Sequence, residues 1–163
     1  MSTSWDFTVR QALQGDLPAL QLLFERFYTE EGFADSIERI SVNLPQLMRR
    51  DDTVVFVAED ADGVVIGAAA MSTAFGLEVG SYAEIEDMYV LPKCRRRGVA
   101  GAMVEQCVAW AAERGCADVE IVVTPESPHR TDLIDWYAKR GFRNTGRVIL
   151  ERNTGAESRE LCA

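Results

Sequence analysis

One stretch of this sequence permits few local structures: a strand-like run that is followed by a basic turn and then by a helix that opens with small residues. The run ends at Val90, consecutive arginines occupy residues 95–97, and a helical pattern begins at Gly98. A helix N-terminus leaves backbone N–H groups unpaired and favours negative charge. Because Gly98, Ala100 and Gly101 carry little or no side chain, an anion can reach these groups. The stretch alone leaves two interpretations open, solvated surface charge and a cradle for a pyrophosphate.

The remaining apolar pattern alternates between strand-like and helix-like segments. Strands are predicted at residues 7–12, 53–58, 64–71, 82–90, 119–124 and 142–152. One helix is predicted between a cap at Asp16 and a break at Gly32, and others at residues 36–50, 98–114 and 131–140. Residues 119–124 form a continuous apolar run, which is typical of a central buried strand. This order predicts an α/β fold in which helices cover the faces of a mixed sheet.

Bulk properties favour a single soluble domain. The 163 residues fit one domain, with a core at about residues 5–152 and a polar tail at residues 153–163. No apolar run approaches the ~20 residues that cross a bilayer, and the N-terminus lacks the pattern of a signal peptide. A net charge of −9 disfavours nucleic acid and suits a cationic substrate. We therefore expect a cytoplasmic protein with no membrane partner and no nucleic-acid partner.

The cysteine and histidine content argues against several chemistries. The four cysteines, Cys94, Cys107, Cys116 and Cys162, show neither CxxC spacing nor a neighbouring histidine cluster. We therefore expect no metal site and no disulfide framework. The single histidine, His129, leaves little material for a Ser-His-Asp hydrolase. Two interpretations of Cys94 stay open, a thiolate stabilised by nearby arginines and an incidental loop thiol.

Two short motifs together resemble a known superfamily. Residues 95–100 match the pattern Gln/Arg-x-x-Gly-x-Gly/Ala, and residues 137–142 match Tyr-x-x-x-Gly-Phe at the usual separation. Over roughly residues 5–152 the sequence thus resembles the GNAT superfamily of acetyl-CoA-dependent N-acyltransferases. The resemblance implies a mixed, mostly antiparallel central sheet flanked by helices, with a V-shaped splay between the two central strands.

The resemblance also implies acetyl-CoA as the cosubstrate. In the superfamily the basic turn holds the pyrophosphate through backbone N–H groups, and the strand before it lies beside the thioester, where an N–H can stabilise the oxyanion. The implied cofactor-binding residues are Met88, Tyr89, Val90, Arg95, Arg96, Arg97, Gly98, Val99, Ala100, Gly101 and Arg130. The arginine side chains either contact phosphates or point into water. Arg130 is included because it stands near the place of a cofactor-binding asparagine in many members.

Acetylation of an amine needs a base for the ammonium and an acid for the departing thiolate. The resemblance implies Tyr137 as the general acid or as a group that orients the thioester, and the alternative is a core tyrosine. The candidate bases, in order, are Glu86, Asp87 and Glu84, each of which is otherwise an ordinary strand carboxylate. Regular alternation places Glu84 and Glu86 on one face and Asp87 on the other, unless a β-bulge intervenes.

Acidic residues near the expected acceptor site suit a cationic amine. The substrate-binding residues are expected to be Glu30, Glu31, Glu86 and Asp87. Residues 86–90, the compact length and the acidic charge look like small aminoglycoside N-acetyltransferases, especially the 3-N type, which are antibiotic-resistance enzymes. The alternatives are another small amine such as a polyamine, a protein N-terminus or lysine, and a non-catalytic acyl-CoA-binding module. The superfamily often dimerises, so a homodimer that involves the C-terminal strand is a further option.

Overall fold

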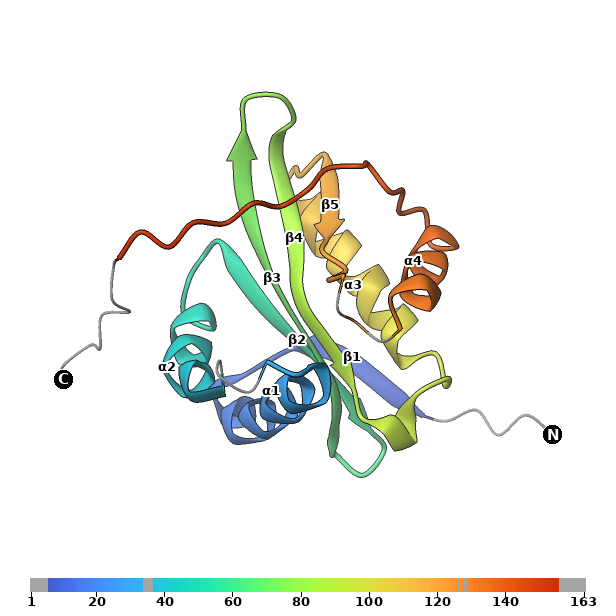
Figure 1. Cartoon of the computed structure of the whole chain (residues 1–163). Coiled ribbons are helices and arrows are strands. Elements are labelled where there is room, and N and C mark those ends of the chain that lie inside the picture. The colour runs from blue at the N-terminus through green and yellow to red at the C-terminus, as the bar shows by residue number, and fades with distance from the viewer. Residues whose placement is uncertain (1–5, 34–36, 126, 128, 156–163) are drawn as a thin grey trace. The chain divides into compact units, whose positions relative to one another are not determined.

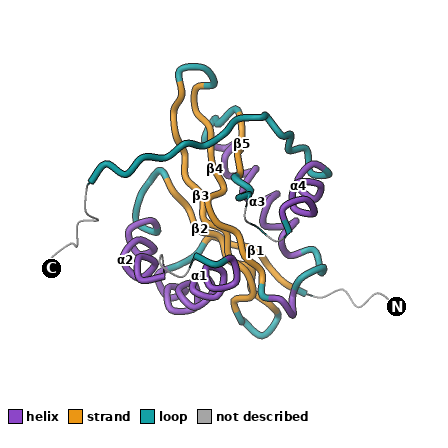
Figure 2. The backbone as a smooth tube through the Cα atoms, viewed as in Figure 1, coloured by secondary structure: helices purple, strands orange, loops and turns teal. Residues whose placement is uncertain are grey.

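The structure, a computed structural model, describes residues 6–33, 37–125, 127 and 129–155 (Figure 1). The predicted helix start at residue 36, Cys162 and residues 156–163 of the predicted tail lie outside the described residues. The chain forms two compact units, Met1–Val122 and Val123–Ala163. Among the described residues, the first unit carries a five-stranded sheet with its covering helices, and the second carries a single helix (Figure 2).

The strands lie in the sheet in the order in which they occur in the chain. They are β1 (Phe7–Gln11), β2 (Thr53–Asp60), β3 (Val65–Gly76), β4 (Gly80–Val90) and β5 (Asp118–Ile121). Pairing is antiparallel from β1 to β4, and β5 pairs with β4 in parallel. This mixed, mostly antiparallel sheet confirms the predicted fold class (Figure 1).

Three helices cover the sheet of the first unit on its two faces (Figure 1). They are α1 (Leu17–Glu31), α2 (Ile37–Leu47) and α3 (Val99–Glu113). Apolar residues of α1 and α2 pack with Val57 and Ala68 on one face, and each large side chain so buried stabilises the fold by ~1.5–3 kcal/mol. On the opposite face α3 lies close to β3. A β-carbon added at Gly67 of β3 would lie 3.2 Å from Met103 Cε of α3. Strand β4 is therefore fixed between two helical layers.

Strand β4 is paired along both edges for only part of its length. Its residues 82–85 pair with β5, whereas its pairing with β3 continues as far as Val90. Among the described residues, no strand pairs with the second edge of β4 beyond Ile85. Pairing stops at this point because β5 ends at Ile121. The unpaired edge leaves backbone groups of β4 open to a ligand.

Two of the predicted strands differ from the structure. The run at residues 119–124 predicts a central strand, but β5 ends at Ile121 and forms an edge of the sheet in the described part of the chain. The strand predicted at residues 142–152 is wrong, because residues 142–155 form no helix or strand and Leu150 is 91% exposed. Apolar and β-branched residues suit a pleated surface, but a strand also needs the hydrogen bonds of a neighbour, which a single segment does not specify.

Candidate functional site

A β-bulge in β4 resets the alternation of its side chains. In the pairing of β3 with β4, Met71 lies opposite Ile85 and Ala70 lies opposite Asp87, so Glu86 is an extra residue. Residues directly opposite each other in paired strands share a face of the sheet. Since Ala70 belongs to the core cluster beneath α1 and α2, Asp87 faces these helices.

The bulge brings the predicted carboxylates together. Ala70 and Ser72 lie two residues apart in β3, so their side chains share a face of the sheet. Ala70 lies opposite Asp87 and Ser72 lies opposite Glu84, so the bulge places Glu84 and Asp87 on that same face. Regular alternation would have separated them. Burial raises the pKa of Glu84, and the negative charges of Glu86, Glu120 and Asp87 raise it further. Neighbouring strands therefore present a concentrated negative charge.

Asp87 has a strongly perturbed pKa. Burial raises this pKa to about 6, a hydrogen bond from Tyr28 opposes the rise, and the charge of Glu86 adds to it. The Tyr28 hydroxyl in α1 donates this bond to Asp87 Oδ2 over 3.1 Å. Burial also raises the pKa of Tyr28, so its hydroxyl remains a donor at neutral pH. A carboxylate that titrates near neutrality can take up and release a proton, as a general base must.

The sequence does not predict the contact between Tyr28 and Asp87. Its partner Asp87 lies 59 positions away in the chain, and no motif spacing links them. Its ring packs edge-on against Phe27 and Phe33, with centroid distances of 5.6 and 6.1 Å. The aromatic cluster at the end of α1 is the signal that marks Tyr28 as a fixed rather than mobile side chain.

The last residues of β4 offer backbone groups at the open edge. The N–H of Leu91 donates to the carbonyl of Ile66 in β3 over 2.9 Å. Antiparallel pairing reverses the direction of successive N–H groups. The amide of Tyr89 therefore faces β3, whereas the amides of Met88 and Val90 face the edge that β5 leaves unpaired beyond Ile85. These two amides are placed to meet a ligand at that edge.

Three side chains connect α1 with the basic turn. The Tyr89 hydroxyl and Arg95 Nη2 donate to the two carboxylate oxygens of Glu30, each over 2.7 Å. Arg95 Nε donates to the carbonyl of Val90 over 2.9 Å, and its guanidinium lies 5.3 Å from the centre of the Tyr89 ring. Burial raises the pKa of Tyr89 to about 12, and the hydrogen bond to Glu30 contributes. Arg95 and Glu30, which the sequence predicts to bind ligands, therefore form an ion pair with each other in this structure.

The backbone of the basic turn has the shape of an anion cradle. Arg96 and Gly98 adopt left-handed φ values of 60° and 87°. The N–H of Ala102 donates to the Gly98 carbonyl over 3.0 Å as the first helical bond of α3. The amides of residues 99–101 precede this bond, so they point out of the helix N-terminus. The exposed turn residues are Arg95, Arg96, Arg97 and Gly98. This donor set fits a pyrophosphate.

Two further predicted positions of the first unit are less directly placed for chemistry. Glu31 is the last residue of α1 and is partly exposed. Cys94 is only 2% exposed, and its N–H donates to the carbonyl of Leu91 over 2.8 Å. A buried thiol is shielded from oxidants and electrophiles, which favours the incidental interpretation of Cys94.

The second unit contains the other motif. Helix α4 (Arg130–Ala138) confirms the predicted helix and begins at the exposed Arg130. Tyr137 is 5% exposed, and its ring meets Trp136 and Phe142 edge-on at 4.9 and 5.3 Å. The Tyr137 ring thus packs against two aromatic side chains of its own unit. The backbone N–H of Phe142 donates to the Tyr137 carbonyl over 3.2 Å, which ties both ends of the motif together.

The described residues offer neither a metal site nor a membrane-spanning helix. In the part of the chain that the structure describes, no group of three or more His, Cys, Asp or Glu side chains is arranged to hold a metal ion. None of the helices formed by the described residues has the length and apolar character needed to span a bilayer.

Known proteins resemble this chain in sequence and in structure. The model of the acetyltransferase (GNAT) family matches residues 17–142. An aminoglycoside N(6′)-acetyltransferase type 1 of Salmonella typhimurium is 31% identical over 111 residues, which cover 66% of this chain and 74% of the relative. A glucosamine 6-phosphate N-acetyltransferase 1 of Oryza sativa subsp. japonica is 33% identical over 117 residues, or 70% of this chain and 64% of the relative.

A solved structure extends the similarity over most of the chain. Aminoglycoside N-acetyltransferase AAC(6′)-Iy, in complex with the bisubstrate analog CoA-S-monomethyl-acetylneamine, superposes with a TM-score of 0.76 at 26% identity. The match covers 91% of this chain and 98% of that chain. The aminoglycoside relatives carry the N(6′) designation, whereas the sequence resemblance suggested the 3-N type.

Proposed function

Because this chain belongs to the acetyltransferase (GNAT) family and is an acetyl-CoA-dependent N-acetyltransferase, we propose that its acceptor is an aminoglycoside-like amine. The observation that carries the proposal is the acidic face of β4, where Glu84 and Asp87 converge beside Glu86. A polycationic amine is attracted to such a face and held by its ammonium groups. The designation of the relatives favours the 6′-amine as the position of acetylation.

The basic turn and the open edge of β4 are the proposed binding site for the cosubstrate. The amides of residues 96–101 hold the pyrophosphate at the N-terminus of α3. Acetyl-CoA, when bound, supplies the acetyl group as an activated thioester. The amides of Met88 and Val90 orient the thioester at the open edge, and either N–H can stabilise negative charge on its oxygen. Arg95 positions the turn through Glu30 and the Val90 carbonyl.

Asp87 is the proposed general base. Its pKa of about 6 leaves it ionised at neutral pH and basic enough to take a proton from a substrate ammonium. Tyr28 orients the carboxylate through its hydrogen bond. The exposed Glu86 binds a substrate ammonium, and Glu84 adds negative charge to the same face. The order of the bases thus changes from that expected from the sequence, with Asp87 now ahead of Glu86.

Tyr137 is the proposed general acid, supported by its place in the Tyr-x-x-x-Gly-Phe motif. A neutral phenol, with an ordinary pKa of ~10, can protonate a thiolate at neutral pH. Arg130 is proposed to replace the cofactor-binding asparagine of other members. The variant Tyr137→Phe should lower kcat more than it raises the dissociation constant for CoA, as measured by steady-state kinetics and calorimetry. An unchanged kcat would remove Tyr137 from the mechanism.

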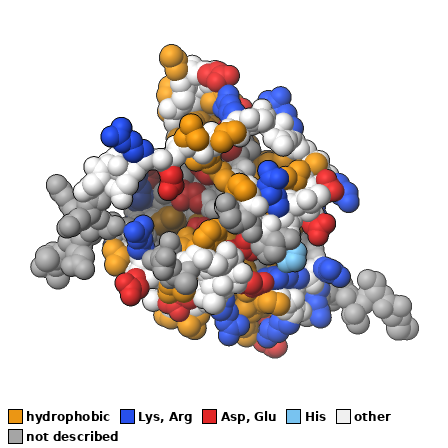
Figure 3. All heavy atoms as spheres, viewed as in Figure 1, with side chains coloured by type: hydrophobic (Ala, Val, Ile, Leu, Met, Phe, Trp, Pro, Cys, Tyr) orange, Lys and Arg blue, Asp and Glu red, His pale blue; other side chains and the backbone are white. Residues whose placement is uncertain are grey.

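Several features outside the site complete the proposal. The family match at residues 17–142 includes parts of both compact units, which supports a single acetyltransferase domain. Basic and acidic side chains are interspersed on the face shown in Figure 3, which supports a small-molecule acceptor over nucleic acid. Glu31, the last residue of α1, is proposed to bind a substrate ammonium. A cytoplasmic location and a homodimer are also proposed.

A panel of amines tests the proposed acceptor. Purified protein is supplied with acetyl-CoA and with aminoglycosides, polyamines or peptides, and the release of CoA is followed. We expect kanamycin-like and gentamicin-like amines to give the highest kcat/KM. If acetyl transfer occurs only to polyamines or only to peptides, the acceptor belongs to that class and not to the aminoglycosides. CoA binding without transfer to any amine would indicate a non-catalytic module.

A further inference from the structure

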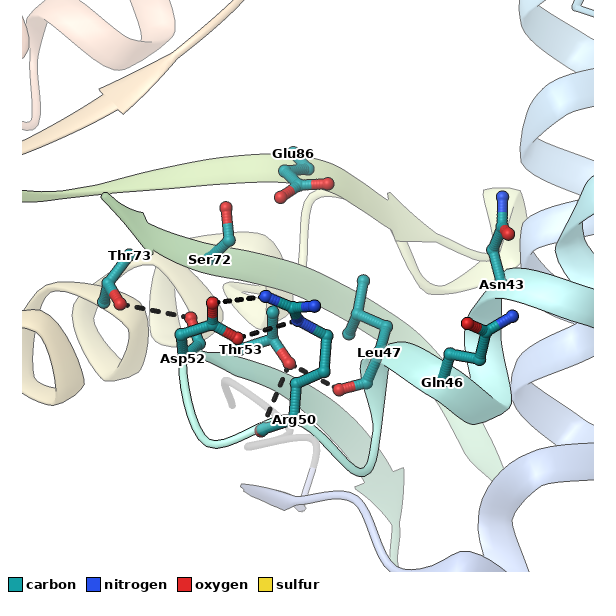
Figure 4. A pocket seen from close by; sticks show the side chains of 9 residues that line it. All are labelled: Asn43, Gln46, Leu47, Arg50, Asp52, Thr53, Ser72, Thr73 and Glu86. Carbon is teal, nitrogen blue, oxygen red and sulfur yellow. Dashed lines mark hydrogen bonds and ion pairs between the residues drawn. The ribbon is translucent and has the colours of Figure 1, made fainter. Parts of the chain in front are cut away.

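A polar pocket opens on the first unit beside Glu86 (Figure 4). It measures about 390 Å³, within the ~300–1,000 Å³ range of small-molecule sites. Eight of its nine lining residues carry a polar or charged side chain, and the ninth is Leu47. A hydrophilic molecule that both donates and accepts hydrogen bonds therefore suits this space.

The polar groups come from different elements and surround the same space. Asn43 and Gln46 lie one turn apart on α2, so both amides project from one side of the helix. Ser72 in β3 and Glu86 at the bulge of β4 line the pocket from the sheet (Figure 4). Because Glu86 is adjacent to Asp87 in the chain, the pocket begins next to the proposed general base.

Hydrogen bonds hold the floor of the pocket in place. The backbone N–H and the hydroxyl of Thr73 donate to the carbonyl of Asp52 over 2.8 and 3.2 Å. The Thr53 hydroxyl donates to the carbonyl of Leu47 at the end of α2. Arg50 Nε donates to Asp52 Oδ1 over 2.8 Å. A pocket whose walls are fixed before binding loses little entropy when a ligand enters.

The charge of the pocket favours a cation. The positive charge of Arg50 is balanced by its ion pair with Asp52, so Glu86 leaves a net negative charge. The C-terminus of α2 adds the negative end of its helix dipole. An ammonium group next to hydroxyl groups is the chemistry that matches this lining.

We propose that this pocket binds the part of the acceptor beyond the reacting amine: a hydroxylated ring that carries an ammonium group. The proposal rests on the proposed function and names a substrate-binding region for it. Glu86 pairs with the ammonium, and Asn43 and Gln46 exchange hydrogen bonds with the ring hydroxyls. A multi-ring aminoglycoside gains these contacts, whereas a single-ring amine held at Asp87 does not reach them.

The double variant Asn43→Ala/Gln46→Ala tests the pocket. Its kcat/KM is measured with a kanamycin-like three-ring amine and with a glucosamine-like single-ring amine, alongside the wild type. We expect the ratio of kcat/KM for the three-ring amine to kcat/KM for the single-ring amine to be about tenfold lower in the double variant than in the wild type. The main cause should be a higher KM for the three-ring amine. The matched control is Ser41→Ala, which removes a hydroxyl from α2 outside the lining, where it donates to the Glu38 carbonyl over 3.0 Å. This control should keep the wild-type ratio.

The outcomes separate this proposal from the proposed function. A wild-type enzyme that acetylates aminoglycosides, together with an unchanged ratio in the double variant, overturns the pocket and leaves the function intact. An equal fall in the ratio for Ser41→Ala also overturns it, because the loss would then come from α2 as a whole. A wild-type enzyme that acetylates no aminoglycoside overturns both proposals.

Discussion

The two halves of β4 serve the proposed reaction by different means. Up to Ile85 the strand lies between β3 and β5, and this half with the following bulge presents the carboxylates of Glu84, Glu86 and Asp87. Beyond the bulge the strand keeps one neighbour and presents the amides of Met88 and Val90 at the open edge. Burial shifts side-chain pKa values in the first half, whereas in the second half we propose that a ligand takes the place of a neighbouring strand.

This division predicts different sensitivities to mutation. A site made of side chains fails when a functional group is replaced, even if the backbone is unchanged. A site made of amides tolerates the loss of side chains but fails when the backbone conformation is altered. Substitutions at Asp87 and at the basic turn should therefore affect turnover and CoA binding separately.

The largest expected effect is that of Asp87→Asn. We expect kcat to fall by about 100-fold or more, because the base is lost, while the dissociation constant for CoA changes less than about twofold. The pKa of Asp87 lies above its ordinary value, so ionisation destabilises the folded state as pH rises from ~4 to ~6. The variant should thus unfold at no lower temperature than the wild type at neutral pH.

The control for Asp87→Asn is Glu120→Gln, which removes another negative charge from the same cluster. Its kcat should stay within about threefold of the wild-type value. If the kcat of Asp87→Asn stays within that same range, Asp87 is not the base and Glu84 or Glu86 is the next candidate.

The next effect concerns the backbone half of the site. Gly98→Ala and Gly115→Ala both place a side chain at a left-handed position, with φ values of 87° and 71°, and neither new β-carbon meets an atom within 4 Å. The strain of ~1–2 kcal/mol should therefore be similar. We expect Gly98→Ala to weaken CoA binding by about tenfold and Gly115→Ala to lower only the thermal stability. Equal dissociation constants for CoA, measured by calorimetry, would contradict the cradle.

A smaller effect is expected from Tyr28→Phe, which keeps the ring but removes the hydrogen bond to Asp87. This bond lowers the pKa of Asp87, so its loss should raise the pKa and move the acidic limb of the kcat/KM profile to higher pH. Activity at pH 6 should fall several-fold while activity at pH 8 changes little. A limb that stays in place would separate Tyr28 from the base.

The smallest effect is expected when the Arg95–Glu30 pair is broken. Both side chains are about two-fifths exposed, at 40% and 39%, so solvent screens the pair and its contribution to the free energy of unfolding is under ~1 kcal/mol. Arg95→Ala and Glu30→Ala should lower stability by similar amounts and show coupling in a double-mutant cycle. A tenfold weaker affinity for CoA in Arg95→Ala alone would instead give Arg95 a direct phosphate contact.

The basic turn leaves a clearer signal in the sequence than the side-chain cluster of β4 does. An amide cradle requires small residues at the start of a helix, and the sequence shows them at Gly98 and Ala100. The bulge at Glu86 has no such signal, since neither glycine nor proline marks it. Tyr28 and Asp87, 59 positions apart, meet only in the folded chain.

The same reasoning explains the predictions that differ from the structure. The strand predicted at residues 119–124 has the apolar run of a central strand, but β5 ends at Ile121 and lies at an edge of the described sheet. Residues 142–152 have the composition of a strand, yet strand formation depends on a neighbour that local composition does not reveal. Local patterns identify what a segment can form, whereas its partners decide what it does form.

The pH dependence of acetyl transfer tests the central claim most directly. The kcat/KM for transfer to an aminoglycoside is measured from pH 5 to pH 9 for the wild type and for Asp87→Asn. We predict an acidic limb near pH 6 in the wild type, where Asp87 becomes protonated, and a low rate without this limb in the variant. The same limb in both proteins would show that Asp87 is not the base.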